Sequence, residues 1–152
     1  MEFQVSSISF DSLVADFEKA GGNAQPLVSR FLTNSVTEIQ KKAREKAPHF
    51  TGALQRSILA EEGYPVAKVK VNSPYGAAME YGTKPHMPPV DALTRWANDK
   101  GINPWALAFT IKAKGTKAHP YFKPAIDESK PYINAQLQYV GNRLLNLMAK
   151  GV

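Results

Sequence analysis

A 22-residue stretch enclosed by two prolines constrains the fold of this chain more than any other feature. Pro26 opens it and Pro48 closes it, and between them apolar residues recur with the spacing of one helix face. Four basic residues occupy its last turns, where they complement the helix dipole. We therefore expect a long amphipathic helix over residues 26–47, whose buried face comprises Leu27, Val28, Phe31, Leu32, Val36, Ile39 and Ala43.

After Pro48 the hydrophobic period changes from that of a helix to that of a strand. Residues 57–61 suit a strand, residues 62–65 suit a turn, and residues 66–71 alternate between apolar side chains and lysines. Alternation of this kind is typical of an antiparallel sheet that is buried on one face. The sequence therefore predicts a small sheet packed against the long helix.

Shorter helical patterns surround this core. A first amphipathic helix carries Phe10, Leu13, Val14 and Phe17, with Ser9 or Asp11 as its cap and Gly21-Gly22 at its end. Residues 75–81 fit two helical turns ended by Gly82, and the proline-rich residues 84–89 fit an extended arm or a pinned loop. Further helices are expected over residues 90–99 and 104–112.

A long C-terminal helix is expected over residues 125–148. Its near-heptad apolar stripe consists of Ile126, Ile133, Leu137, Val140, Leu144 and Leu147. This stripe packs against the protein's own sheet or, alternatively, is partly exposed to a neighbouring subunit. Residues 1–152 are thus predicted to form a single α+β domain, with a small antiparallel sheet, two long helices, and short helices inserted between them.

Charge is concentrated in the last third of the chain. The net charge is +6 overall, while residues 101–152 alone carry seven basic and two acidic side chains, or +5. Such a bias favours contact with DNA or with an acidic protein surface, although a solvated face would look the same. The candidate contacts are Lys112, Lys114, Lys117 and Lys123, which alternate with aromatic residues as in single-strand binding platforms.

No catalytic constellation is recognisable. The three histidines, His49, His86 and His119, each adjoin a proline and are far apart in sequence, which favours polar anchors over a metal site. There is no cysteine, no nucleophile elbow and no phosphate loop with the required spacing. The sequence therefore predicts a protein that is not an enzyme and that uses no cofactor and no metal.

Three short motifs combine an aromatic or apolar anchor with a glycine or proline that fixes the backbone. They are residues 51–58 (TGALQRSI), residues 74–83 (PYGAAMEYGT) and residues 119–126 (HPYFKPAI), here called the first, second and third motif. In this order, between a basic helix and a long helix, they resemble the gene-product-ten-like tail-component family of long-tailed bacteriophages. They are also similar to the minor tail protein Z group, and the likeness runs from about residue 28 to residue 140.

The resemblance implies a virion structural protein of the head–tail junction, the neck or tail-completion region, where related components commonly form rings, often sixfold, around the DNA channel. The implied partners are further copies of the chain and neighbouring head-completion, tail-terminator or tail-tube proteins. Non-specific contact with genomic DNA is possible, and no contact with a membrane is expected. The chain would be made and assembled in the bacterial cytoplasm and reside in the virion. The alternative is a basic nucleic-acid-binding accessory protein, and a hydrolase acting through the histidines ranks third.

The motifs suggest which residues contact partners. Gly52 is expected to turn the chain from the long helix into the sheet, and Gly82 to adopt a positive φ as a left-handed cap. Glu80 either pairs with a basic residue of the next subunit or faces water. The expected assembly residues, which could equally pack within the domain, are Tyr75, Glu80, Tyr81, Gly82, Thr83, His119, Pro120, Tyr121, Phe122 and Pro124.

Overall fold

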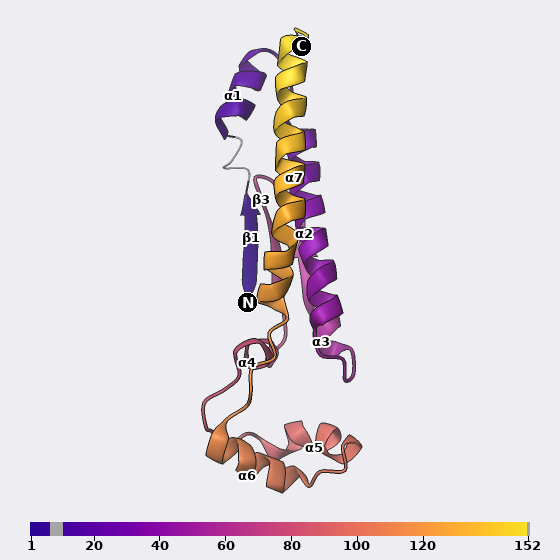
Figure 1. Cartoon of the computed structure of the whole chain (residues 1–152), viewed down its shortest axis with the longest axis vertical. Coiled ribbons are helices and arrows are strands. Elements are labelled where there is room, and N and C mark those ends of the chain that lie inside the picture. The colour runs from indigo at the N-terminus through magenta and orange to yellow at the C-terminus, as the bar shows by residue number, and fades with distance from the viewer. Residues whose placement is uncertain (7–10, 152) are drawn as a thin grey trace.

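The computed structural model, which describes residues 1–6 and 11–151, is an elongated α+β protein (Figure 1). Two long helices, α2 (Gln25–Lys46) and α7 (Phe122–Ala149), run side by side along its length. A three-stranded antiparallel sheet in the order β1-β3-β2 packs against α2, and α2 also packs against α7. The predicted class, with a small antiparallel sheet and long N- and C-terminal helices, is confirmed.

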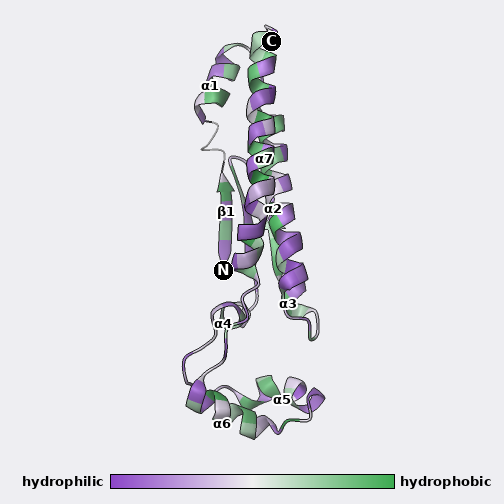
Figure 2. Ribbon diagram, in the orientation of Figure 1, coloured by the Kyte–Doolittle hydropathy of each residue, from purple (hydrophilic) through white to green (hydrophobic). Residues whose placement is uncertain are grey.

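The sheet is built from β1 (Glu2–Ser6), β2 (Ile58–Glu61) and β3 (Val66–Val71). Ala67, Val69 and Val71 of the central strand β3 are buried against α2, whereas Lys68 and Lys70 reach the open face and pair with acidic residues of the outer strands. Figure 2 shows that hydrophobic and hydrophilic residues also alternate along the two long helices. The one-sided sheet predicted from the alternating pattern is therefore confirmed.

The long helix α2 is confirmed as well, and its predicted core residues Val28, Phe31, Leu32, Val36, Ile39 and Ala43 are buried. The first amphipathic helix is α1 (Asp11–Lys19), which buries Val14 and Phe17. Two details of that helix, the contribution of Phe10 and a cap at Ser9, lie outside the described residues.

The apolar stripe of α7 packs mainly against α2 rather than against the sheet. Val140 and Leu144 are buried there, and the other members of the stripe are partly buried around the same core. The predicted packing of this stripe against the sheet was therefore wrong, because α2 lies against α7 along the stripe.

The first motif joins α2 to the sheet as expected. Gly52 has a φ of 70° and opens a four-residue helix, α3 (Ala53–Arg56), which leads directly into β2. Arg44 of α2 holds this turn by donating from Nη2 to the carbonyl of Ile58 at 2.8 Å, while the Gln55 side chain donates back to the Arg44 carbonyl. Sequence reasoning missed both α3 and strand β1.

Three further helices lie between β3 and α7. These are α4 (Gly76–Tyr81), α5 (Val90–Asp99) and α6 (Pro104–Lys114), all close to their predicted ranges. Helices α5 and α6 form a hairpin that projects from the end of the molecule opposite α1 (Figure 1). We call residues 84–115, which contain this hairpin, the arm, and the rest of the described chain the body.

Candidate assembly site: a helical arm and its mounting

The second and third motifs, which are about 40 residues apart in sequence, meet in space and hold the arm on the body. The meeting point is the carboxylate of Glu80, at the end of α4. Its Oε2 accepts backbone N–H bonds from Tyr121 and Phe122, both at 2.8 Å, and its Oε1 accepts from Lys123 N at 2.9 Å. Glu80 therefore caps the N-terminus of α7 from a different element.

This cap supplies hydrogen-bond acceptors that α7 does not supply to its own first N–H groups. The first N–H groups of a helix have no intrahelical acceptor, and the N-cap residue Tyr121 has no side-chain cap of its own. A negative group also interacts favourably with the positive end of the helix dipole. Glu80 is only 2% exposed and is bonded within the chain, so it does not face water, and of the sequence-based alternatives packing within the domain is the one that the structure shows.

Tyr121 strengthens the same junction from the other side. Its ring is fully buried, and its hydroxyl donates to the carbonyl of Gly76 at the start of α4, at 3.2 Å. Burial, reinforced by the nearby charge of Glu80, raises the pKa of Tyr121 to about 12. A further bond, from His119 N to the Met79 carbonyl at 2.7 Å, closes α4 against the third motif.

The base of the arm is formed where its two connecting segments cross. Thr83 and Thr116 face each other in an isolated antiparallel bridge with both backbone N–H···O bonds made, at 3.1 and 3.2 Å. Their hydroxyl oxygens lie 3.0 Å apart. These bonds join the outgoing and returning segments of the arm at its base.

Two glycines allow the segments to approach this closely. Gly82 and Gly115 have φ values of 71° and 74° with ψ near 180°, a combination that is essentially restricted to glycine. A Cβ on Gly82 would lie 2.5 Å from the Thr116 carbonyl oxygen, and one on Gly115 would collide with the Thr83 carbonyl oxygen. The predicted positive φ of Gly82 is confirmed, but its ψ of −177° differs from that of a left-handed cap.

Beyond its base the arm has very little core of its own. Helix α6 begins at a capped N-terminus, where Asn103 Oδ1 accepts from Trp105 N at 2.9 Å. Together α5 and α6 bury only three apolar side chains, Ala97, Ala108 and Ile111. Residues 104–111 of α6 nevertheless contain a single polar residue, Thr110. A helix that is apolar all round is normally buried on all sides.

The outer face of α6 is instead open to solvent. Trp105 is 58% exposed and Phe109 is 57% exposed, and their ring centroids lie 6.5 Å apart, one helical turn from each other. Three further large apolar residues of the arm are exposed, namely Met87, Trp96 and Ile102. We call the pair Trp105 and Phe109 the apolar face of the arm. Exposed aromatic residues that contact each other in this way are typical of an interaction site.

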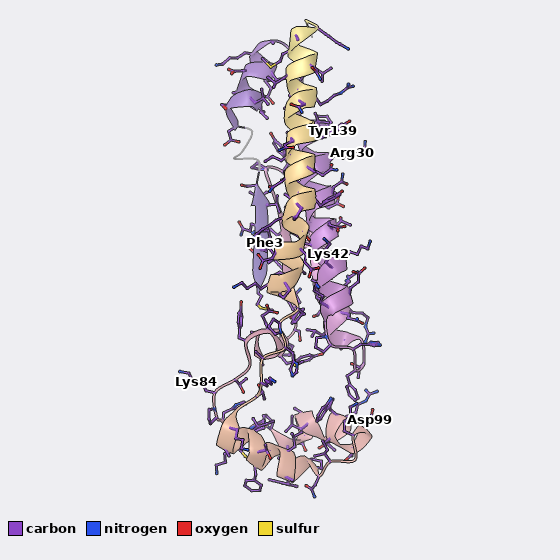
Figure 3. The ribbon with its side chains drawn as sticks, viewed as in Figure 1. Phe3, Arg30, Lys42, Lys84, Asp99 and Tyr139 are labelled. Carbon is purple, nitrogen blue, oxygen red and sulfur yellow. The ribbon has the colours of Figure 1, made fainter. Side chains whose placement is uncertain are left out.

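The arm is also basic. Residues 84–115 carry five basic side chains and two acidic ones, a net charge of +3, which is half of the +6 of the whole chain. Lys112, Lys114 and Lys117 are exposed near the base, and none of them forms an ion pair within the described part of the chain. Figure 3 shows Lys84 at one end of the arm and Asp99 at the other.

The structure divides the predicted assembly residues into three groups. Glu80, Tyr121 and Phe122 are buried and hold the junction together, and Gly82, Thr83 and Pro124 are half-buried in or near it. Tyr75, Tyr81, His119 and Pro120 are exposed on its surface, with Tyr81 68% exposed. Lys123 is exposed at the start of α7, apart from the base of the arm. The most exposed aromatic residues of the arm, Trp105 and Phe109, were not predicted, although the apolar run in residues 104–111 signalled them.

Side chains that could ligate a metal ion do not cluster in the described residues. No three His, Asp or Glu side chains there lie close enough to hold a metal ion. His49 contacts the Gln55 side chain and His86 contacts the Lys84 carbonyl, so the histidines serve separate local turns. Within residues 1–6 and 11–151 there is also no helix with the length and apolar character needed to cross a membrane.

Comparison with protein-family models, curated proteins and solved structures gives no match to this chain. The site is therefore interpreted from its own geometry.

Proposed function

We propose that this protein is a non-enzymatic virion structural protein of a long-tailed bacteriophage and acts at the head–tail junction. The observation that carries the proposal is the arm, a helical hairpin whose apolar face is exposed and whose base is fixed by backbone pairing. A preorganised binding surface suits assembly, because its side chains and backbone lose less conformational entropy when a partner binds.

The sequence motifs add the phage context. The three motifs resemble those of the tail-component family, and the second and third of them form the junction between α4, the arm and α7. In this proposal the chain is a ring subunit of the neck or tail-completion complex, with its own copies and adjoining neck proteins as partners. It is made in the host cytoplasm and ends in the virion.

Disruption of the gene tests this assignment. If the chain completes the neck, lysates of the disrupted phage contain DNA-filled heads and separate tails, and a plasmid copy of the intact gene restores joined particles. Electron micrographs that show normal joined particles without the protein would refute the proposal.

The charge of the arm supports a second candidate function, that of a nucleic-acid-binding accessory protein. Lysines without ion pairs can neutralise phosphates and release counterions, so affinity for duplex DNA would fall steeply with salt. Replacing Lys112, Lys114 and Lys117 by glutamine would weaken binding and flatten this salt dependence. Negligible binding to a DNA duplex at low salt removes this candidate.

A further inference from the structure

The apolar face of the arm requires a cover that the arm does not supply. Helices α5 and α6 pack on each other, and among the described residues no other element covers the ring faces of Trp105 and Phe109. Because the two rings are only a little over half exposed, leaving them so forgoes roughly 1 kcal/mol each relative to full burial. The cover is therefore expected to come from another molecule.

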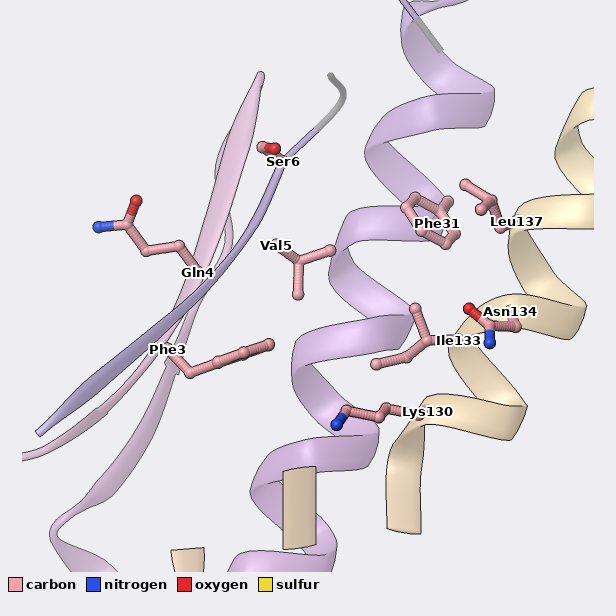
Figure 4. A pocket seen from close by; sticks show the side chains of 9 residues that line it. All are labelled: Phe3, Gln4, Val5, Ser6, Phe31, Lys130, Ile133, Asn134 and Leu137. Carbon is pink, nitrogen blue, oxygen red and sulfur yellow. The ribbon is translucent and has the colours of Figure 1, made fainter. Parts of the chain in front are cut away.

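The body of the same chain offers a groove that is lined by five apolar and four polar residues. It has a volume of about 260 Å³ and lies where β1, α2 and α7 meet. Figure 4 shows Phe3 and Val5 pointing from β1 towards Ile133 and Leu137 of α7 and Phe31 of α2. Cavities of about 150 Å³ accommodate a benzene ring, so the groove has room for an aromatic side chain.

The charge around this groove does not oppose a basic partner. Its one cation, Lys130, is bonded to Asp127 at 2.6 Å, and this bond lowers the pKa of the Asp127 carboxyl. A second groove, between α2 and α7, is less suitable, because it is lined by Arg30, Asn34 and Gln136, and Arg30 has no ion pair among the described residues. The first groove is thus the better receptor for an aromatic and basic arm.

The arm does not reach the groove of its own chain. Figure 3 places Phe3, which lines the groove, on the body, well away from Lys84 and Asp99 at the two ends of the arm. A chain that presents an aromatic projection in one place and a groove in another has the two halves of a head-to-tail contact. Repetition of such a contact closes a ring when the rotation permits.

We propose that the arm of one copy docks through Trp105 and Phe109 into the groove between β1 and α7 of a second copy. The inference rests on the proposed assembly function, since it names the partner of the arm. Trp105, Phe109 and the three other exposed apolar residues of the arm, which are 38–58% exposed, together offer on the order of 450 Å² per copy. A contact that covers them on both sides then buries about 900 Å², less than the ~1,200–2,000 Å² of a stable interface and in the range of a weak one. We therefore expect self-association to be concentration-dependent.

Cysteine cross-linking tests this contact directly, because the natural chain contains no cysteine. One protein carries Ala106→Cys, which is exposed beside Trp105 and Phe109, and a second carries Asn134→Cys, which is exposed at the groove. The matched control is Asn146→Cys, exposed on the same helix but about 18 Å further along. All three positions are exposed, so the fold is retained.

The purified proteins are mixed in pairs and oxidised with glutathione disulfide. Docking raises the effective concentration of the two thiols, so Ala106→Cys should link to Asn134→Cys about tenfold more than to Asn146→Cys. Adding Trp105→Glu and Phe109→Glu to the arm partner should abolish this excess. Equal linking to both positions, or predominant linking between two Ala106→Cys chains, would overturn the proposal.

This experiment uses only the purified chain, so it separates the contact from the phage assignment. Absence of cross-links together with separate heads and tails after gene disruption would reject the self-contact and keep the neck function. Specific cross-links together with normal particles after gene disruption would keep the self-contact and reject the neck function.

Discussion

Glu80 is the only buried carboxylate in the part of the chain that the structure describes, and it makes three backbone bonds to the start of α7. Its role could not be predicted from sequence, because its partners are 41 to 43 residues away and it resembles any acid at the end of a short helix. The three motifs indicated which residues are structurally constrained. They did not indicate that the second and third motifs form one junction between α4 and α7.

Replacing Glu80 by glutamine should destabilise the protein. The amide keeps one acceptor oxygen but places an NH₂ group against helix N–H donors, and a charge-assisted cap is lost. We expect the free energy of unfolding to fall by roughly 2–4 kcal/mol. Denaturant titration of the variant checks this, with the exposed Glu62→Gln as the matched control. Equal stability of the two variants would contradict the cap.

Tyr121 should make stability depend on pH in the alkaline range. Its folded pKa of about 12 lies above the unfolded value near 10, so its contribution is complete below pH 10 and is lost as the pH rises towards 12. We expect a loss of about 2–3 kcal/mol across this window. The free energy of unfolding, measured from pH 9 to 12 in the natural chain and in Tyr121→Phe, checks the sign of this effect. The variant should lose less stability over this range. If both free energies fall in parallel, Tyr121 does not contribute this pH dependence.

At the scale of elements, local patterns predicted α2, β2, β3 and the inserted helices, because each shows its own period or proline boundary. Strand β1 has only five residues, and it is stabilised by non-local pairing with β3, as between Phe3 and Val69. The alternation of Phe3 and Val5 with polar neighbours was its only signal. The crossing at Thr83 and Thr116 left no signal beyond two glycines.

The glycines of this crossing can be compared with a third that also has a positive φ. Gly101 has a φ of 66° but open space around its α-carbon, so alanine there should cost only about 1–2 kcal/mol. Alanine at Gly82 or Gly115 also collides with the opposing backbone and should cost roughly 3 kcal/mol or more. Thermal unfolding of the three variants measures the difference. If all three lose the same stability, the crossing does not require close approach.

At the scale of the whole molecule, the chain divides its tasks between two parts. The body contains nearly all of the buried core, whereas the arm contains few buried residues and half of the net charge. Composition revealed the basic excess but not that it lies on a projecting hairpin, since that depends on how residues 82–83 and 116–117 meet. The division predicts that arm and body respond differently to mutation.

Substitution on the apolar face of the arm should therefore spare folding. Trp105 and Phe109 are more than half exposed, so glutamate at both positions should change the free energy of unfolding by less than about 1 kcal/mol. Circular dichroism and denaturant titration of the double variant check this. A large loss of stability would mean that the two rings belong to the core of the chain.

The most direct measurement of the central claim, that the arm is an assembly surface, is the infectious titre of a phage whose disrupted gene is complemented by this double variant. We expect the variant to accumulate as folded protein and yet to leave heads and tails separate, whereas the natural chain restores joined particles. A titre equal to that of the natural chain would contradict the claim.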